Sequence, residues 1–300
     1  MTNLFHQRLE KELARRRQDG LFRQLQIAPP CRVNLSANDY LQLRNHPSVL
    51  EGATRAMERF GSSSGASPLL SGFLPCHDHL LMQLLEWKQK PSGLLFNTGF
   101  MANQAVLKHL PGSSDLVLVD RLIHHSMAQA LLQGKANFKR YHHLDLDHLE
   151  ELLDKNQKNY ETVFVATESV FSMDGDYPDM GRLAALKSKW GFVWILDEAH
   201  GTGVFGPTGC GLAEEHGVLS QVDILIGTLG KALASMGGYV LTHSTSVVDH
   251  LINYAGELIY STFLPPAQAG AASAALELAR ESKGKRDHLR TMGALFRKKL

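Results

Sequence analysis

The sequence predicts an α/β protein built on one large, mainly parallel sheet flanked by helices. Short apolar runs rich in β-branched residues recur through the middle of the chain, as is typical of buried strands. Segments with helical spacing separate most of these runs, as expected where crossover helices join parallel strands. The 300 residues, 44% of them hydrophobic, are enough to form a substantial core around such a sheet.

The expected elements follow in chain order. A first amphipathic helix is predicted at 4–25, with its Arg15-Arg16-Arg17 run on a solvated face, and a Ser/Gly-rich loop at 61–72. The predicted strands are 94–96, 116–119, 163–167, 192–196, 224–226 and 239–241. Helices are predicted at 103–110, 146–154, 183–189, 267–280 and 288–300.

We expect three regions along the chain. Residues 1–45 form an N-terminal arm and the start of a small lobe, and 46–265 form the large α/β domain. Residues 266–300 are a helical segment. The sequence ends at Leu300 in a helical pattern, without the further strands that a second α/β lobe needs.

Charge and cysteine content exclude several classes of protein. The 31 basic and 30 acidic side chains nearly cancel, so no net field draws the molecule to nucleic acid or an anionic membrane. Cys31, Cys76 and Cys210 are odd in number and lack C-x-x-C spacing, which disfavours a disulfide framework or a zinc site. The sequence contains neither a signal peptide nor an apolar run of membrane-spanning length. We expect a cytoplasmic protein without nucleic-acid, membrane or metal partners.

Two polar segments follow predicted strands directly. Asp197 and His200, in the block Asp-Glu-Ala-His-Gly-Thr-Gly, come after the strand at 192–196, and Lys231 comes after the strand at 224–226. The carboxyl ends of parallel strands line the ligand crevice of such sheets, so these side chains are expected to face a ligand. Small and apolar neighbours desolvate the Lys231 amine and lower its pKa, which favours condensation with an aldehyde.

Three other interpretations of these segments carry less weight. The letters D-E-A-H suggest a nucleic-acid translocase, but the sequence has no P-loop. Gly201-x-Gly203-x-x-Gly206 matches the dinucleotide fingerprint, but Pro207 and Gly209 predict a loop where that motif needs a helix. An ordinary buried carboxylate and a solvated lysine explain each residue singly, but not their coincidence.

The same segments supply what pyridoxal 5'-phosphate (PLP) chemistry requires. Lys231 is the candidate for the Schiff base, Asp197 for the carboxylate at the pyridine nitrogen, and His200 for the phenolic oxygen. The turn at 98–101, before a helix, offers free N–H groups to a phosphate, and Thr228 adds a hydroxyl. His124 follows a strand and is a candidate to stack on the ring, although a lone histidine there is more often a surface residue.

From about Asn34 to Ala269 the chain resembles the α-oxoamine synthases, a family of fold type I PLP enzymes. The pieces that carry the resemblance are Ser36-Ala37-Asn38-Asp39-Tyr40-Leu41, Ser71-Gly72, His77, Thr98-Gly99-Phe100-x-Ala102-Asn103, Asp120-Arg121-x-x-His124, Phe171-Ser172-Met173-Asp174-Gly175-Asp176, Asp197 to Gly203, Thr228-Leu229-Gly230-Lys231 and Tyr260-Ser261-Thr262-x-x-Pro265-Pro266-Ala267. The resemblance implies the PLP-dependent transferase fold.

The resemblance also implies a role for each site residue. Lys231, His124, Asp197 and His200 are the expected catalytic residues, and all four contact the cofactor. The other expected cofactor contacts are Gly99, Phe100, Ser172, Thr228, Ser261 and Thr262. Ser261 and Thr262 are expected to reach the phosphate of a neighbouring subunit, since the family forms homodimers with shared active sites. Asn38 and His124 are the expected substrate contacts, with Arg23 as the candidate for the acyl substrate.

Within the family, the segment around Tyr260 is most similar to the members that condense L-alanine with pimeloyl-CoA, or a pimeloyl carrier protein, to 8-amino-7-oxononanoate in biotin biosynthesis. Activities of the glycine C-acetyltransferase and 5-aminolevulinate synthase types are the alternatives. The family continues beyond the position of Leu300 with a C-terminal lobe whose arginine holds the amino-acid carboxylate. We therefore expect a truncated acyltransferase with its small lobe largely missing, or a PLP-binding protein without turnover.

Overall fold

The computed structural model describes residues 3–27 and 34–299, which belong to two compact units, Met1–Ala37 and Asn38–Leu300. The first unit contains α1 (Leu4–Gln18), capped by the Asn3 side chain, which accepts a hydrogen bond from the Phe5 N–H. None of the residues of α1 is buried. The helix ends earlier than predicted because Gly20 adopts a left-handed conformation (φ +68°) and turns the chain. Cys31 lies outside the described residues.

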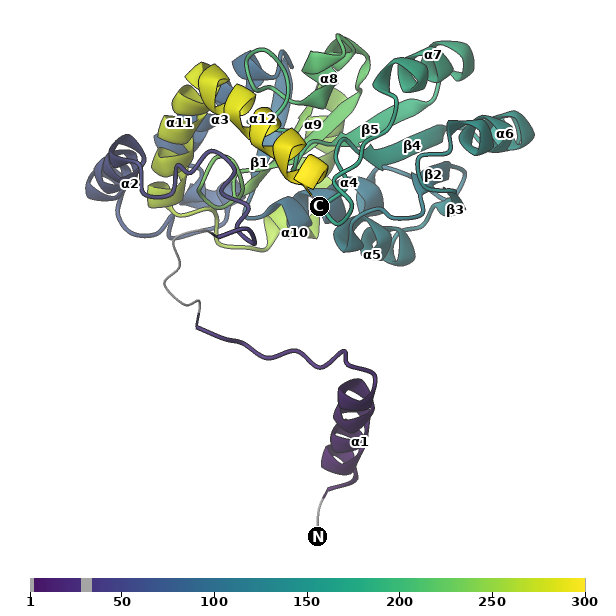
Figure 1. Ribbon diagram of the computed structural model, residues 1–300, viewed down its shortest axis with the longest axis horizontal. Helices are drawn as coiled ribbons and strands as arrows, with labels where there is room; N and C mark the ends of the chain where they lie inside the picture. Colours follow the sequence, from purple (N-terminus) through teal and green to yellow (C-terminus); the bar gives the residue numbers. More distant parts are fainter. Residues whose placement is uncertain (1–2, 28–33, 300) are drawn as a thin grey trace. The chain divides into compact units, whose positions relative to one another are not determined.

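The second unit is built on a seven-stranded sheet with the order β1-β7-β6-β5-β4-β2-β3 (Figure 1). Only β7 runs antiparallel to its neighbours, so the sheet is mainly parallel, as predicted. The strands are β1 (Ser92–Phe96), β2 (Leu116–Asp120), β3 (Asn137–Tyr141), β4 (Val163–Glu168), β5 (Val193–Asp197), β6 (Ile224–Thr228) and β7 (Gly238–Thr242).

All the predicted strands are confirmed, and one strand was missed. β3 has the sequence Asn-Phe-Lys-Arg-Tyr and pairs only with β2, at the edge of the sheet. Its side chains are mostly exposed, and only Tyr141 is buried. An edge strand with charged residues lacks the apolar signal of a central strand, which explains the omission.

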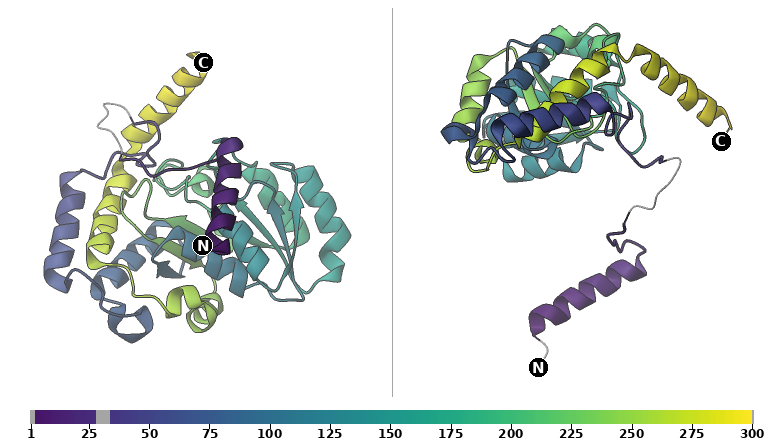
Figure 2. Two further views of the ribbon diagram at one scale, coloured as in Figure 1. Left: turned by 90° about the horizontal axis from the view of Figure 1, so that it is seen from below. Right: turned by 90° about the vertical axis from the view of Figure 1, so that its left-hand side faces the viewer.

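Helices cover the sheet, and further helices lie beside its β1 end (Figures 1 and 2). α4 packs against β1, β6 and β7, while α11 packs against α2 and α3. No helix within the described ranges is both long and apolar enough to cross a membrane. The α-helices of this unit are α2 (Pro47–Phe60), α3 (Pro75–Trp87), α4 (Gly99–His109), α5 (His125–Gln133), α6 (Leu146–Asn156), α7 (Met180–Trp190), α8 (Leu212–Glu215), α9 (Thr245–Tyr254), α10 (Gly256–Ile259), α11 (Pro266–Glu281) and α12 (Lys283–Lys299).

The carboxyl ends of β1, β2, β4, β5 and β6 lie at one edge of the sheet because these strands run in the same direction. The interior of the sheet is apolar, and β2 is buried along its whole length. Polar side chains therefore gather where the strands end, which is where sheets of this class bind ligands.

Candidate active site

A cavity of about 250 Å³ lies at this edge of the sheet. Five of the strands that end here, β1, β2, β4, β5 and β6, contribute to its wall through their last residues or the loops that follow. The lining residues are Thr98, Gly99, Phe100, Asn103, His124, Ser126, Glu168, Asp197, Ala199, His200, Gly227, Thr228 and Lys231. The structure thus brings together seven residues of the predicted site: Gly99, Phe100, His124, Asp197, His200, Thr228 and Lys231.

Lys231 and His200 are in direct contact inside this cavity. The Lys231 Nζ atom lies 2.7 Å from His200 Nε2. Burial lowers the pKa of the Lys231 amine, and the nearby carboxylates of Asp197 and Glu168 only partly oppose this effect. Burial, together with the positive charge of Lys231, lowers the pKa of His200 to about 4, so its imidazole is neutral at physiological pH. Burial therefore makes the Lys231 ammonium easier to deprotonate, and the ring beside it is neutral.

Asp197 ends β5 and is only 5% exposed. Its two carboxylate oxygens accept hydrogen bonds from the Asn103 amide (2.7 Å) and the backbone N–H of Ala199 (2.8 Å). Glu168, at the end of β4, accepts a hydrogen bond from the His124 N–H (2.5 Å). Burial and the negative charge of Asp197 raise the pKa of Glu168 to about 8, so Glu168 holds a proton at neutral pH while Asp197 supplies the fixed charge.

The start of α4 lies at one end of the cavity. The Thr98 hydroxyl caps the helix by accepting from the Met101 N–H (3.1 Å), so α4 begins at Gly99 and not near Asn103 as predicted. The earlier start places the first amides, those of Gly99 and Phe100, at the positive end of the helix. A Cβ atom at Gly99 would lie 3.2 Å from Thr228 Cβ, so the backbone closely approaches the Thr228 hydroxyl.

His124 lies at the open side of the cavity and caps α5. Its Nδ1 atom lies 2.7 Å from the Ser126 hydroxyl and accepts from the Ser126 N–H (3.2 Å). These contacts hold the ring in place, although His124 is an exposed residue. The position is compatible with the predicted stacking role, which stays a prediction.

Buried charges hold the loop that carries His200. The Lys88 amine is fully buried and donates to the Thr202 hydroxyl (2.8 Å) and to the Cys210 carbonyl. Glu198, also fully buried, accepts from the backbone N–H groups of α8. A Cβ atom at Gly201 would lie 2.0 Å from the Glu198 carboxylate, so only glycine fits there. Glu198 and Gly201 therefore serve the shape of the loop, whereas Asp197 and His200 face the cavity.

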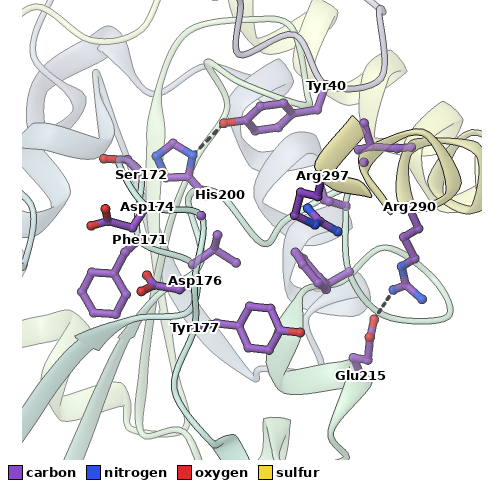
Figure 3. Close-up of a pocket in the computed structure, with 16 residues that line it drawn as sticks. Tyr40, Phe171, Ser172, Asp174, Asp176, Tyr177, His200, Glu215, Arg290 and Arg297 are labelled. Carbon is purple, nitrogen blue, oxygen red and sulfur yellow. Dashed lines mark hydrogen bonds and ion pairs between the residues drawn. The ribbon is translucent and has the colours of Figure 1, made fainter. Parts of the chain in front are cut away.

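A larger cavity of about 800 Å³ shares His200 with the first, and Tyr40 lines the larger cavity beside His200 (Figure 3). One wall is aromatic, with Tyr177 in edge-to-face contact with Phe205. α12 contributes Arg290, which pairs with Glu215, and Arg297, which has no ion-pair partner among residues 34–299. The larger cavity thus combines an apolar wall with an available positive charge.

The remaining predicted site residues lie elsewhere. Ser172 is exposed and lines the larger cavity, and Asn38 accepts a hydrogen bond from Tyr40. Ser261 and Thr262 do not line the smaller cavity; the Asn97 side chain donates to the Ser261 hydroxyl (2.9 Å) and to the Thr262 carbonyl (2.7 Å). Arg23 belongs to the first unit. The roles of these residues stay predictions.

Sequence reasoning assigned no role to four residues that complete the site. Asn103 and Tyr40 lie within the quoted motifs, but their hydrogen-bond partners, Asp197 and His200, are distant in sequence. Ser126 comes two residues after His124, and its contact with that ring depends on the local fold. Glu168 carries the same signal as Asp197, a carboxylate at the end of a buried strand. That signal was sufficient to find it.

The donor set of the smaller cavity fits PLP. An amine of lowered pKa, a carboxylate held by two hydrogen bonds, and a helix start beside a hydroxyl lie in one enclosed space. These are the groups required for the aldehyde, the pyridine nitrogen and the phosphate of the cofactor. The fold and the site therefore define a PLP-dependent enzyme of fold type I.

Comparison with known proteins identifies the family. The model of the family described as aminotransferase class I and II matches residues 32–300. The chain belongs to this family and, within it, to the α-oxoamine synthases that include 8-amino-7-oxononanoate synthase.

The relatives agree on this assignment. An 8-amino-7-oxononanoate synthase of Geobacter sulfurreducens is 41% identical over 299 residues, 95% of this chain and 76% of its own length. A serine palmitoyltransferase structure from S. paucimobilis with a bound PLP–myriocin aldimine superposes with a TM-score of 0.86 at 26% identity, covering 96% and 76% of the two chains. For an 8-amino-7-oxononanoate synthase of Francisella tularensis the TM-score is 0.72 at 26% identity, covering 85% and 71%. Across eight curated relatives, the chain spans between 61% and 78% of their length.

Proposed function

We propose that this chain catalyses the decarboxylative condensation of L-alanine with a pimeloyl thioester, on coenzyme A or a carrier protein, to give 8-amino-7-oxononanoate for biotin biosynthesis. The observation that carries the proposal is the contact of Lys231 with His200 in one cavity with Asp197, in a chain 41% identical to such a synthase. The Cα of alanine loses a proton and gains a bond to the acyl carbon while the thiol leaves; it then loses its carboxylate as CO₂ and takes up one proton in its place.

PLP, when bound, supplies an electron sink that makes the Cα proton of the amino acid acidic. Lys231 is the residue that would hold its aldehyde, and Asp197 would keep its pyridine nitrogen protonated. Gly99, Phe100 and Thr228 would receive the phosphate. His124 would cap the ring and orient the acyl carbonyl, as the family resemblance implies.

Lys231 would also act as the general base. Its Nζ atom is neutral at physiological pH to the extent that burial lowers its pKa, and a neutral amine can accept the Cα proton. His200 is itself neutral, so it adds no positive charge that would oppose protonation of the amine. The low dielectric of the cavity strengthens the fixed field of Asp197.

The larger cavity would receive the acyl substrate. Its aromatic wall at Tyr177 and Phe205 suits an aliphatic chain, and Arg297 offers positive charge to a free carboxylate at the chain's end. Arg23 is our sequence-based candidate for the same role. Ser172 and Asn38 would border the path between the two cavities.

We also propose that the active protein is a homodimer in the cytoplasm. Leu70 and Tyr260 are 83% and 87% exposed, and Tyr260 precedes the residues expected to reach a second subunit, Ser261 and Thr262. Exposed apolar side chains of this size favour a protein interface. The thiols of Cys76 and Cys210 are free, as suits a reducing compartment. Sedimentation equilibrium is expected to give twice the chain mass, and a monomer at micromolar concentration would contradict the dimer.

The direct test of the activity is release of coenzyme A from pimeloyl-CoA in the presence of PLP. Release that requires L-alanine, with 8-amino-7-oxononanoate as product, is the expected result. Lys231→Ala removes the release, whereas Lys155→Ala, on the exposed face of α6, retains it. Release with glycine and acetyl-CoA, or with glycine and succinyl-CoA, would instead assign one of the two alternative activities. PLP binding without release from any of these pairs would contradict the proposed catalysis.

A further inference from the structure

Tyr40 lines the larger cavity and is hydrogen-bonded to His200, which lines both cavities (Figure 3). Its hydroxyl oxygen lies 2.7 Å from His200 Nδ1, and the opposite nitrogen, Nε2, lies 2.7 Å from Lys231 Nζ. The same hydroxyl donates to the Asn38 amide oxygen (3.2 Å). The line runs from exposed Asn38 through half-buried Tyr40 and His200 to the reactive amine.

The chemistry of the end groups sets the direction of each bond. The Asn38 amide oxygen only accepts, so the Tyr40 hydroxyl donates to it, and the Tyr40 oxygen is left to accept from Nδ1–H of His200. The Nε2 lone pair then accepts from the protonated Lys231 amine. A neutral imidazole carries one proton, and these bond directions require it on Nδ1.

We propose that Tyr40 is a positioning residue that sets which nitrogen of His200 carries the proton, and therefore whether the ring offers an acceptor or a donor to the cofactor cavity. A hydroxyl can reverse its role by rotation, without movement of heavy atoms. After such a reversal Tyr40 donates to Nδ1, and Nε2 presents an N–H to the cavity. Burial raises the pKa of Tyr40, so the hydroxyl keeps its proton at neutral pH.

The reversal accounts for a proton that Lys231 must lose. The Lys231 ammonium gives one proton to Nε2, Nδ1 gives its proton to the Tyr40 oxygen, and Tyr40 releases its former hydroxyl proton to solvent on the side of exposed Asn38. The sum is one proton moved from Lys231 to solvent, with His200 and Tyr40 neutral before and after. The step rests on the proposed function, in which the neutral amine then combines with PLP and an acceptor oxygen of the cofactor needs a donor from His200.

The test compares Tyr40→Phe with Tyr177→Phe by ¹⁵N NMR of the His200 ring nitrogens, assigned by the signals lost in His200→Asn. Tyr177 lines the same cavity and contacts Phe205, and none of the described residues links it to His200 by a hydrogen bond. In the wild type, we expect the proton on Nδ1 without cofactor and on Nε2 after PLP is added. In Tyr40→Phe both forms become mixtures, and the dissociation constant for PLP rises roughly fivefold to tenfold, the effect of one neutral hydrogen bond. Tyr177→Phe is expected to match the wild type in both His200 tautomers and in PLP affinity.

Two outcomes would overturn the proposal. One is a Tyr40→Phe protein whose His200 tautomers match the wild type in both forms, even if PLP affinity falls, because a merely structural role of Tyr40 predicts that pattern. The other is an equal change in Tyr177→Phe. If PLP fails to attach to Lys231 in the wild type, the proposed function fails, whereas the spectra without cofactor still decide whether Tyr40 controls the tautomer.

Discussion

At the scale of single residues, the site works by separating the protonation states of neighbouring groups. Asp197 receives two donors, whereas Glu168, close to it, is buried and faces its negative charge. Two carboxylates in one cavity therefore take different states, one charged and one protonated. The sequence analysis assigned a role to Asp197 and none to Glu168, although both are carboxylates at the end of a buried strand. Their closeness, which shifts the pKa of Glu168, follows only from the fold, which places the ends of β4 and β5 side by side.

Glu168→Gln should reduce the pH dependence of stability. Folding raises the pKa of Glu168 from 4.5 to about 8, so between these values the folded protein holds a proton that the unfolded chain releases. The free energy of unfolding of the wild type therefore falls as pH rises through this window, by at most about 1.4 kcal/mol per pH unit from this group. Glutamine carries no such proton, so the fall is smaller in the variant.

Urea unfolding of the cofactor-free protein at pH 5, 6, 7 and 8 measures the difference. Glu151→Gln, on the exposed face of α6, is the matched control and should follow the wild type. Parallel curves for the wild type and Glu168→Gln would show that Glu168 is already ionised in the folded protein at pH 5.

At the scale of elements, the beginning of α4 shows how a helix end becomes part of a site. Helical spacing alone predicts the helix from Asn103, because Thr98, Gly99 and Phe100 have no apolar periodicity. The Thr98 cap adds the first turn and leaves the amides of Gly99 and Phe100 at its positive end. Strand β3 was missed because its own residues face solvent and show no apolar pattern, although its partner β2 is apolar. The exact start of a helix and the presence of an edge strand both depend on the neighbouring elements, so the local sequence predicts them poorly.

Thr98→Ala should weaken both the helix and the phosphate site. Loss of the cap leaves the Met101 N–H without its acceptor and costs about 1 kcal/mol of stability. Asp179→Ala removes the equivalent cap of α7, which contributes no residue to the smaller cavity, and should cost a similar amount. Of the two variants, only Thr98→Ala is expected to reduce affinity for PLP. Its affinity for pyridoxal, which lacks the phosphate, should be unchanged. Equal loss of affinity for both ligands would argue against a phosphate site at this helix.

At the scale of the whole molecule, the order of the strands assembles the site from five separate segments. Residues between 98 and 231 meet at one edge because the strands that precede them run in the same direction. The alternation of strands and helices predicts this meeting, and the contacts of Lys231 with His200, and of His200 with Tyr40, specify it. The expected boundaries at 45/46 and 265/266 stay predictions, as do the second-subunit roles of Ser261 and Thr262, because both depend on how larger parts of the protein assemble.

The most direct test of the PLP site is to incubate the protein with PLP, reduce it with borohydride and locate the modified lysine by peptide mass mapping. We predict a single phosphopyridoxyl group on Lys231 and its loss in Lys231→Ala. Lys90 is a stringent internal comparison, because burial also lowers the pKa of its amine, to about 8, although it lines neither of the two cavities described above. Modification of Lys90 or another lysine in place of Lys231, or no modification, would contradict the assignment of the cavity as a PLP site.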